Sequence, residues 1–203
     1  MSVHPKLAPE QQLTIPEFLA MVAARPNGER WELIEGVAVL SPSPVQIHQM
    51  VVGNIISFLL AHKERTEAAW FPMVGVGTRV PVSPRSLPQP DVYVQAGPPL
   101  DSPTTDDALV IIEVLSRSNT KADQAWRRRV YASVANCAHY VTVSLKAPEI
   151  VVHSRSGEWV GVTFAGLGTA AELPAIAVSL PLATVYRWTP LETAKAATPK
   201  RRT

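Results

Sequence analysis

The stretch ALVIIEVLS, residues 108–116, places one carboxylate, Glu113, inside a run of apolar residues. Five apolar residues precede Glu113 and two follow it, which is the pattern of a central strand covered on both faces. A carboxylate in such a strand loses solvation, and this is costly unless a cation or hydrogen bonds compensate. Glu113 is therefore either a structural residue neutralised by an arginine or by backbone donors, or a functional residue at the C-terminal end of a strand, where α/β folds place their sites.

A second carboxylate, Asp91, stands in a comparable setting. It begins the predicted strand Asp91–Gln95, directly after Pro90 and a proline-rich turn. Aspartate after proline is common in turns, so Asp91 taken alone favours a structural role. Two strands that each bring one carboxylate to the same region of a sheet would supply the oxygen ligands that Mg²⁺ prefers. The sequence does not show whether these two strands are neighbours.

The remaining pattern predicts a mixed α/β unit with an N-terminal β-hairpin. Helices are expected from Thr14, from Val45 to about Lys63 and from about Ala122 to Ala135. The hairpin covers Arg30–Ile34 and Val37–Leu40. Strands are expected at Met73–Val82, Asp91–Gln95, Leu109–Leu115, His139–Leu145, Glu149–His153 and Glu158–Phe164. The order of the core is helix, three strands, helix, strand. The final strand–helix–strand connection predicts a parallel pair of strands.

Length and composition indicate one globular domain. The chain has 203 residues, a net charge of +2 and a single cysteine, and we expect one domain over residues 1–190 followed by a disordered basic tail over residues 191–203. One cysteine cannot form an internal disulfide, so a cytoplasmic location is expected. Apolar runs such as Ala108–Ile112 are far shorter than the roughly 20 residues that span a bilayer, so no membrane association is expected.

Several motifs, taken in order, resemble those of a bacterial family of restriction endonucleases within the PD-(D/E)XK nuclease superfamily. They are Trp31–Gly36 (WELIEG), Ser41-Pro42, His48, Pro90-Asp91-Val92 and Glu113–Ser116 (EVLS). The family also has an aspartate, a lysine four residues later and a tyrosine four beyond that, and here Asp123, Arg127 and Tyr131 have this spacing. The resemblance covers residues 12–165 and implies a restriction-endonuclease-like core, whose element order is the one predicted above.

The resemblance also implies a metal site. It makes Asp91 and Glu113 the ligands of Mg²⁺ or Mn²⁺, with the main-chain carbonyl of Val114 as a third ligand. Glu32 would come from the hairpin and complete the acidic pocket. His48 would line the same pocket from its helix, although a histidine near the start of a helix is also an ordinary polar residue.

The chain departs from the superfamily at its lysine. Many members have this lysine two residues after the glutamate, where Leu115 stands here, and the resembling family has it on the helix, where Arg127 stands. An arginine can bind phosphate and stabilise a transition state, but it stays protonated and cannot act as a base. Lys121, at the start of the same helix, is the alternative donor.

The resulting hypothesis is a metal-dependent endonuclease that hydrolyses DNA phosphodiester bonds. One alternative is a weakened nuclease-fold module that binds nucleic acid without cleaving it, because the lysine has become Arg127. The other is a structural protein in which salt bridges hold the carboxylates. The sequence does not determine the oligomeric state, and a homodimer is compatible with it.

Overall fold

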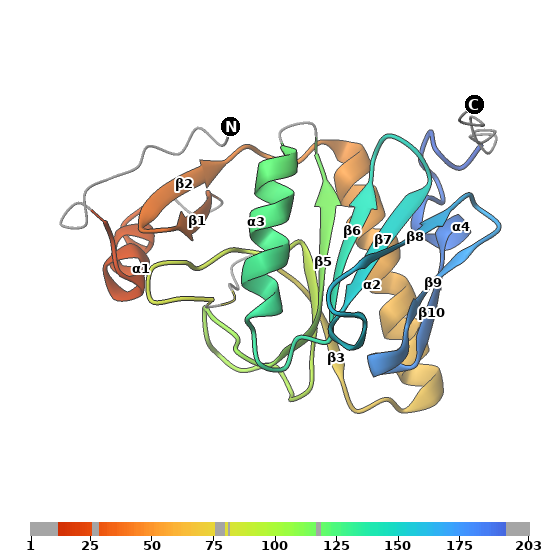
Figure 1. The fold of residues 1–203 in the computed structure, drawn as a ribbon, viewed down its shortest axis with the longest axis horizontal. Coiled ribbons are helices and arrows are strands. Elements are labelled where there is room, and N and C mark those ends of the chain that lie inside the picture. The colour runs from red at the N-terminus through yellow and green to blue at the C-terminus, as the bar shows by residue number, and fades with distance from the viewer. Residues whose placement is uncertain (1–11, 26–28, 76–79, 81, 117–118, 194–203) are drawn as a thin grey trace.

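A mixed six-stranded sheet forms the centre of the protein (Figure 1). The computed structural model describes residues 12–25, 29–75, 80, 82–116 and 119–193. The strands lie in the order β3-β4-β5-β6-β7-β8, with β3 at Phe71–Val74, β4 at Val92–Gln95, β5 at Ala108–Leu115, β6 at His139–Ser144, β7 at Glu149–Ser154 and β8 at Gly161–Ala165. The pair β5 and β6 is parallel and the other neighbours are antiparallel. This confirms the predicted parallel connection.

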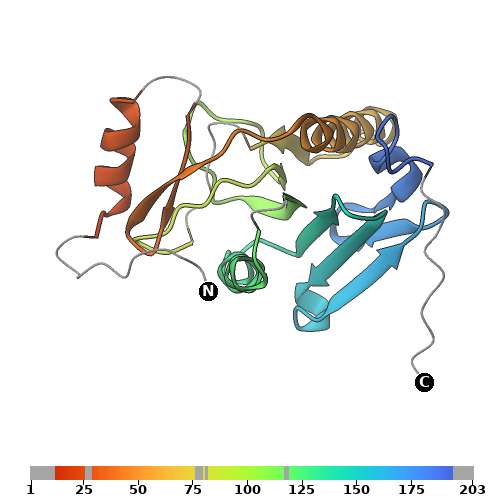
Figure 2. The same cartoon turned by 90° about the horizontal axis from the view of Figure 1, so that it is seen from above.

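Helices cover both faces of the sheet. Helix α2 (Gln46–Thr66) lies on one face and α3 (Lys121–Ala132) on the other, as the view from above shows (Figure 2). The chain therefore runs α2, β3, β4, β5, α3, β6, which is the predicted order of helix, three strands, helix, strand. Helix α3 begins with a capping box in which Thr120 accepts from the main chain of Asp123 and the Asp123 carboxylate accepts in return.

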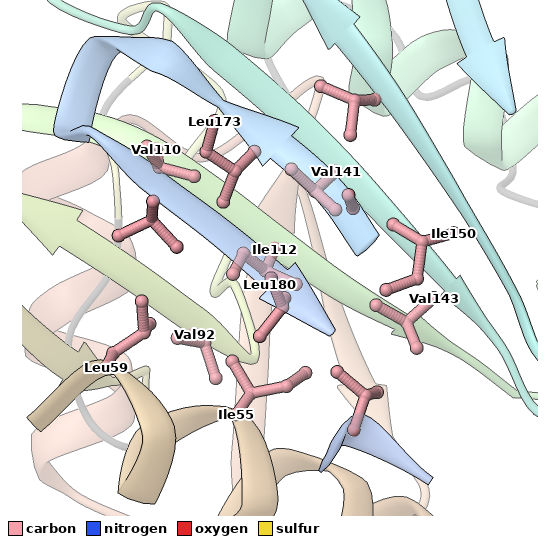
Figure 3. Packing of buried hydrophobic residues seen from close by; sticks show 14 of the residues in the cluster. Ile55, Leu59, Val92, Val110, Ile112, Val141, Val143, Ile150, Leu173 and Leu180 are labelled. Carbon is pink, nitrogen blue, oxygen red and sulfur yellow. The ribbon is translucent and has the colours of Figure 1, made fainter. Parts of the chain in front are cut away.

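The face of the sheet toward α2 is apolar. Successive side chains of a strand point to opposite faces, so alternate residues of each strand form one continuous layer (Figure 3). That layer includes Val92, Val110, Ile112, Val141, Val143 and Ile150, and it packs against Ile55 and Leu59 of α2. The same core includes a ribbon of β9 (Ala170–Leu173) and β10 (Val178–Pro181), joined by the 3₁₀ turn Pro174–Ile176, and the short helix α4 (Leu182–Val185).

The face toward α3 combines aromatic and polar residues. Tyr93, Ile111 and Tyr140 of the sheet pack with Tyr131 of α3 in a separate cluster. Glu113 has the same parity along β5 as Ile111, and it therefore lies on this face. The polar groups of the protein's central sheet are thus concentrated on the side of α3.

An N-terminal hairpin lies beside the sheet. Strands β1 (Arg30–Ile34) and β2 (Val37–Ser41) pair antiparallel, and Glu35 and Gly36 between them have φ of 49° and 83°. Positive φ at both central residues is typical of a tight hairpin turn. Helix α1 (Ile15–Ala23) packs on the hairpin through Phe18, and it begins with the capping box of Thr14 and Glu17.

Some predicted boundaries were wrong. The predicted strand Met73–Val82 corresponds to the shorter β3, and residues 76–79 and 81 lie outside the described residues. The predicted strand Glu158–Phe164 begins only at Gly161, because a 3₁₀ turn at Arg155–Gly157 precedes it and Glu158 and Trp159 have positive φ. The β9–β10 ribbon was not predicted.

The disordered tail over residues 191–203 stays a prediction, because residues 194–203 lie outside the described part of the chain. Its first residue, Leu191, is partly buried against the core on the α2 side of the sheet. Within the described residues, no helix is long and apolar enough to cross a membrane.

Candidate active site

The register of β4 and β5 brings two carboxylates together. The last pair of this antiparallel ladder is Val92 with Ile112, so one residue further on Asp91 comes opposite Glu113. Directly opposite residues of two strands share one face, with Cβ atoms about 4.5–5.5 Å apart. A hydrogen bond from the main-chain N–H of Val114 to Asp91 Oδ2 (2.8 Å) continues the connection between the strands. The sheet thus holds both predicted ligands side by side on the α3 face.

Asp91 is surrounded by donors. Arg30 Nη1 donates to its Oδ1 (2.7 Å), while His48 Nε2 (3.2 Å) and the Val114 N–H donate to its Oδ2. Burial alone would raise the pKa of Asp91, but the hydrogen bond from His48 and the charge of Arg30 outweigh it and lower the pKa to about 2. Asp91 is therefore ionised at every ordinary pH.

Glu113 has the opposite electrostatic balance. Its Oε1 accepts from Arg127 Nη1 (2.8 Å) and from the Tyr131 hydroxyl (3.0 Å). Burial raises the pKa of Glu113 to about 7, because the charge of Arg127 compensates only in part and the nearby carboxylates Asp91 and Glu32 add repulsion. Two neighbouring carboxylates with pKa values shifted in opposite directions are a pattern typical of functional sites.

Arg127 links the hairpin to the sheet. Its Nη2 donates to both carboxylate oxygens of Glu32 (3.0 and 2.8 Å), while its Nη1 binds Glu113. Burial opposes the charge of Arg127, but the two glutamates outweigh it and raise the pKa of the guanidinium well above its usual range. Glu32 also accepts a hydrogen bond from the Gln89 N–H (2.8 Å). Burial alone would raise the pKa of Glu32, but Arg127, Arg30 and this N–H lower it.

The structure brings Glu32, Asp91, Glu113 and Arg127 into one buried cluster, which we call the acid cluster, and His48 contacts it through Asp91. Lys121 is not part of the cluster. It is exposed at the first position of α3 and lines a different hollow, described below.

Arg30, which lies beside Asp91, was not predicted from the sequence as part of this site. Arg30 binds Asp91 and also donates to the main-chain carbonyl of Gln89. Arg30 stands two residues before Glu32 in β1, and residues two apart in a strand share a face. This alternation was the available signal, since it places Arg30 beside any site that Glu32 reaches.

The donor set fits a hard divalent cation. Mg²⁺ takes one or two carboxylates and completes its octahedron with water and phosphate oxygens, and Glu113 Oε2 accepts no hydrogen bond from any described residue. The N–H and C=O of one residue in a strand point to the same side, so the Val114 carbonyl faces Asp91 as its N–H does. Within the described residues, no group of three or more histidine, cysteine or carboxylate side chains forms a metal site, so main-chain, water or substrate oxygens would complete the coordination.

The comparisons with known proteins give the family. The profile of the Uma2 family, described as "Putative restriction endonuclease", matches residues 15–184. This chain belongs to the Uma2 family. The match confirms the family resemblance that the sequence motifs indicated.

A solved structure supports the fold. A protein from Anabaena variabilis ATCC 29413, titled a putative nuclease belonging to DUF820, superposes on this Uma2 protein with a TM-score of 0.71 at 14% identity, covering 87% of this chain and 98% of its own. At this identity the likeness establishes the fold, which confirms the expected mixed α/β restriction-endonuclease-like class. None of the curated proteins matches the chain. Family and fold together indicate a nuclease.

Proposed function

We propose that this protein is a metal-dependent endonuclease that hydrolyses phosphodiester bonds of DNA. The observation that carries the proposal is the placement of Asp91 directly opposite Glu113 on one face of the sheet, with the Val114 carbonyl on the same side. Asp91, Glu113 and the Val114 carbonyl would hold Mg²⁺ or Mn²⁺. When bound there, the cation supplies Lewis-acid stabilisation of the phosphate and acidifies a water molecule.

The residues around the ligands have separate tasks. Arg30 and His48 hold Asp91 in a single orientation, since they bind its two different oxygens. Glu32 anchors Arg127 from the hairpin. Arg127 carries a permanent positive charge next to Glu113, where it would offset the negative charge of a phosphate, and its raised pKa excludes a role as general base.

One observation favours the alternative of a module that binds nucleic acid without cleaving it. Arg127 occupies Glu113 Oε1 at 2.8 Å, and it stands at the position where the resembling family has a lysine. Glu113 would have to hold a metal ion in competition with this salt bridge. If Arg127 holds Glu113 more strongly than the ion would, the fold and the exposed Arg128 and Arg129 of α3 remain while hydrolysis is lost.

The direct test is cleavage of supercoiled DNA in Mg²⁺ or Mn²⁺, compared with the same reaction in EDTA. We expect metal-dependent nicking by the parent and its loss, by about a hundredfold or more, in Asp91→Asn and Glu113→Gln. Glu64→Gln is the matched control, because it makes the same chemical change at an exposed position of α2.

A second measurement separates the alternatives. Mn²⁺ should raise the melting temperature of the parent and of Glu64→Gln, and should not raise that of Glu113→Gln. DNA binding without cleavage, in both the parent and Arg127→Lys, would support the binding module. Absence of a metal-induced shift would refute the metal-dependent proposal, and absence of both the shift and DNA binding would leave the carboxylates as structural salt-bridge partners.

A further inference from the structure

A hollow with several polar side chains in its lining lies beside the acid cluster, on the same face of the sheet. It measures about 360 Å³ and lies between α3 and the strands β6 and β7. The side of α3 contributes Lys121, Gln124 and Arg128, and the sheet contributes Tyr140, Thr142 and His153.

The strand register places this hollow next to Glu113. Thr142 of β6 is the direct parallel partner of Glu113, and Val151 of β7 is the partner of Thr142. Neighbouring strands lie about 4.8 Å apart, so the hollow begins roughly 5–10 Å from Glu113. A nucleic-acid strand whose phosphodiester lay at Glu113 would thus bring an adjacent phosphate over β6 and β7.

The lining of the hollow suits an anion. Lys121 and Arg128 are exposed, and neither forms a salt bridge with a described residue. Two cations that converge on one concave surface without carboxylate partners concentrate positive potential there. Helix α3 therefore presents Arg127 to the acid cluster and Lys121 with Arg128 to the hollow.

The lining of the hollow contains an unused donor. The Tyr140 hydroxyl is buried, and it has no hydrogen-bond partner among the residues that the structure describes. A buried hydroxyl without a partner is costly, since it has given up water without gaining another acceptor. An anion in the hollow offers that acceptor.

The Tyr140 ring is held firmly in place. It stacks on His153 with ring centroids 5.9 Å apart and contacts Tyr131 at 5.4 Å. His153 Nδ1 donates to the Trp159 carbonyl (3.0 Å), and a Cβ on Gly161 would lie 2.7 Å from the His153 ring. Tyr140 and His153, on the sheet side of the hollow, are therefore packed against each other and against their neighbours.

We propose that this hollow binds a backbone phosphate of the nucleic-acid strand next to the one positioned at Asp91 and Glu113, through Lys121, Arg128 and the Tyr140 hydroxyl. This inference rests on the proposed function. It assigns Lys121 to substrate binding, in place of the role as alternative catalytic donor that its position in the sequence suggested.

The test measures binding of a fluorescein-labelled DNA duplex by anisotropy, with Ca²⁺ replacing Mg²⁺ so that cleavage does not interfere. Arg128→Gln should weaken binding roughly threefold or more, and should lower the slope of log affinity against log salt by about 1. Arg129→Gln is the matched control, because it removes the same charge from the next residue of α3, which does not line the hollow. Lys121→Gln combined with Arg128→Gln should have the largest effect, and Tyr140→Phe should weaken binding without changing the salt slope.

The outcomes separate this inference from the proposed function. Retained Mn²⁺-induced stabilisation of Arg128→Gln, together with weaker DNA binding, supports the phosphate site. If the parent binds DNA, and Arg128→Gln and Arg129→Gln bind it with the same affinity and the same salt slope as the parent, the phosphate site is overturned. The nuclease proposal is then left intact. A parent that binds no DNA at all would overturn both.

Discussion

The two faces of the central sheet differ in what they contribute. The α2 face consists mainly of aliphatic side chains such as Ile112 and Val143, which are fully buried. The α3 face holds Glu113, which follows Ile112 in β5, and Arg127, which binds Glu113 from the facing helix. Burying apolar surface stabilises the fold in proportion to area, whereas burying charge costs free energy unless partners compensate. We infer that the α2 face supplies stability and that the α3 face uses part of it to hold a charged site.

The largest effect is expected from removing the central cation of the α3 face. Arg127→Ala leaves Glu32 and Glu113 buried without their shared partner, and such a change costs about 3–5 kcal/mol of unfolding free energy. Only 11% of the Arg127 side chain is exposed, so this arginine contributes to folding as well as to the site. Urea unfolding at neutral pH measures the loss. Arg129→Ala, an exposed position on the same helix, should change stability by less than about 0.5 kcal/mol.

A smaller loss is expected from the α2 face. Ile112→Val removes one methylene from the apolar layer and should cost about 0.5–1.5 kcal/mol. Because the side chain points away from the acid cluster, DNA cleavage per folded molecule should remain at the parent level. A large fall in cleavage by folded Ile112→Val would show that the two faces are not functionally separate.

The third expected effect is a change in melting temperature on replacing Glu113. This change depends on pH and is smallest in acid. The pKa of Glu113 is raised to about 7 in the folded protein, so its favourable contribution to stability is present below its unfolded pKa and is lost as the pH rises through about 7. Asp91, with its pKa lowered to about 2, contributes stability that is lost only as the pH falls toward that value. Above pH 7, Glu113→Gln should therefore melt at a higher temperature than the parent. Between about pH 5 and pH 7, its melting temperature should not fall with rising pH as that of the parent does. Metal-free melting curves across this range provide the measurement, and an unchanged slope would contradict the assigned pKa.

The order of elements and the identity of the acids could be predicted from the sequence. Strongly apolar strands such as Ala108–Leu115 are visible without tertiary information, and a glutamate within one of them is conspicuous. The spacing of Arg127 and Tyr131, four residues apart, predicted one helical face, and both side chains bind Glu113. The short strands β9 (AAEL) and β10 (VSLP) were missed because they contain one β-branched residue between them and a proline, whereas the equally short β4 (VYVQ) is rich in residues that favour strands.

Which charges meet was decided by tertiary structure alone. The sequence determined that Asp91 and Glu113 each lie at a strand, that Arg127 and Lys121 share one helix, and that a hairpin carries Glu32. It did not determine that β4 lies beside β5 in the register that sets Asp91 opposite Glu113, or that α3 turns Arg127 toward the acids and Lys121 toward a separate hollow. The physical reason is that local pattern specifies which face of an element is buried, whereas the pKa of Glu113 and the pairing of Arg127 depend on neighbours that are distant in the chain.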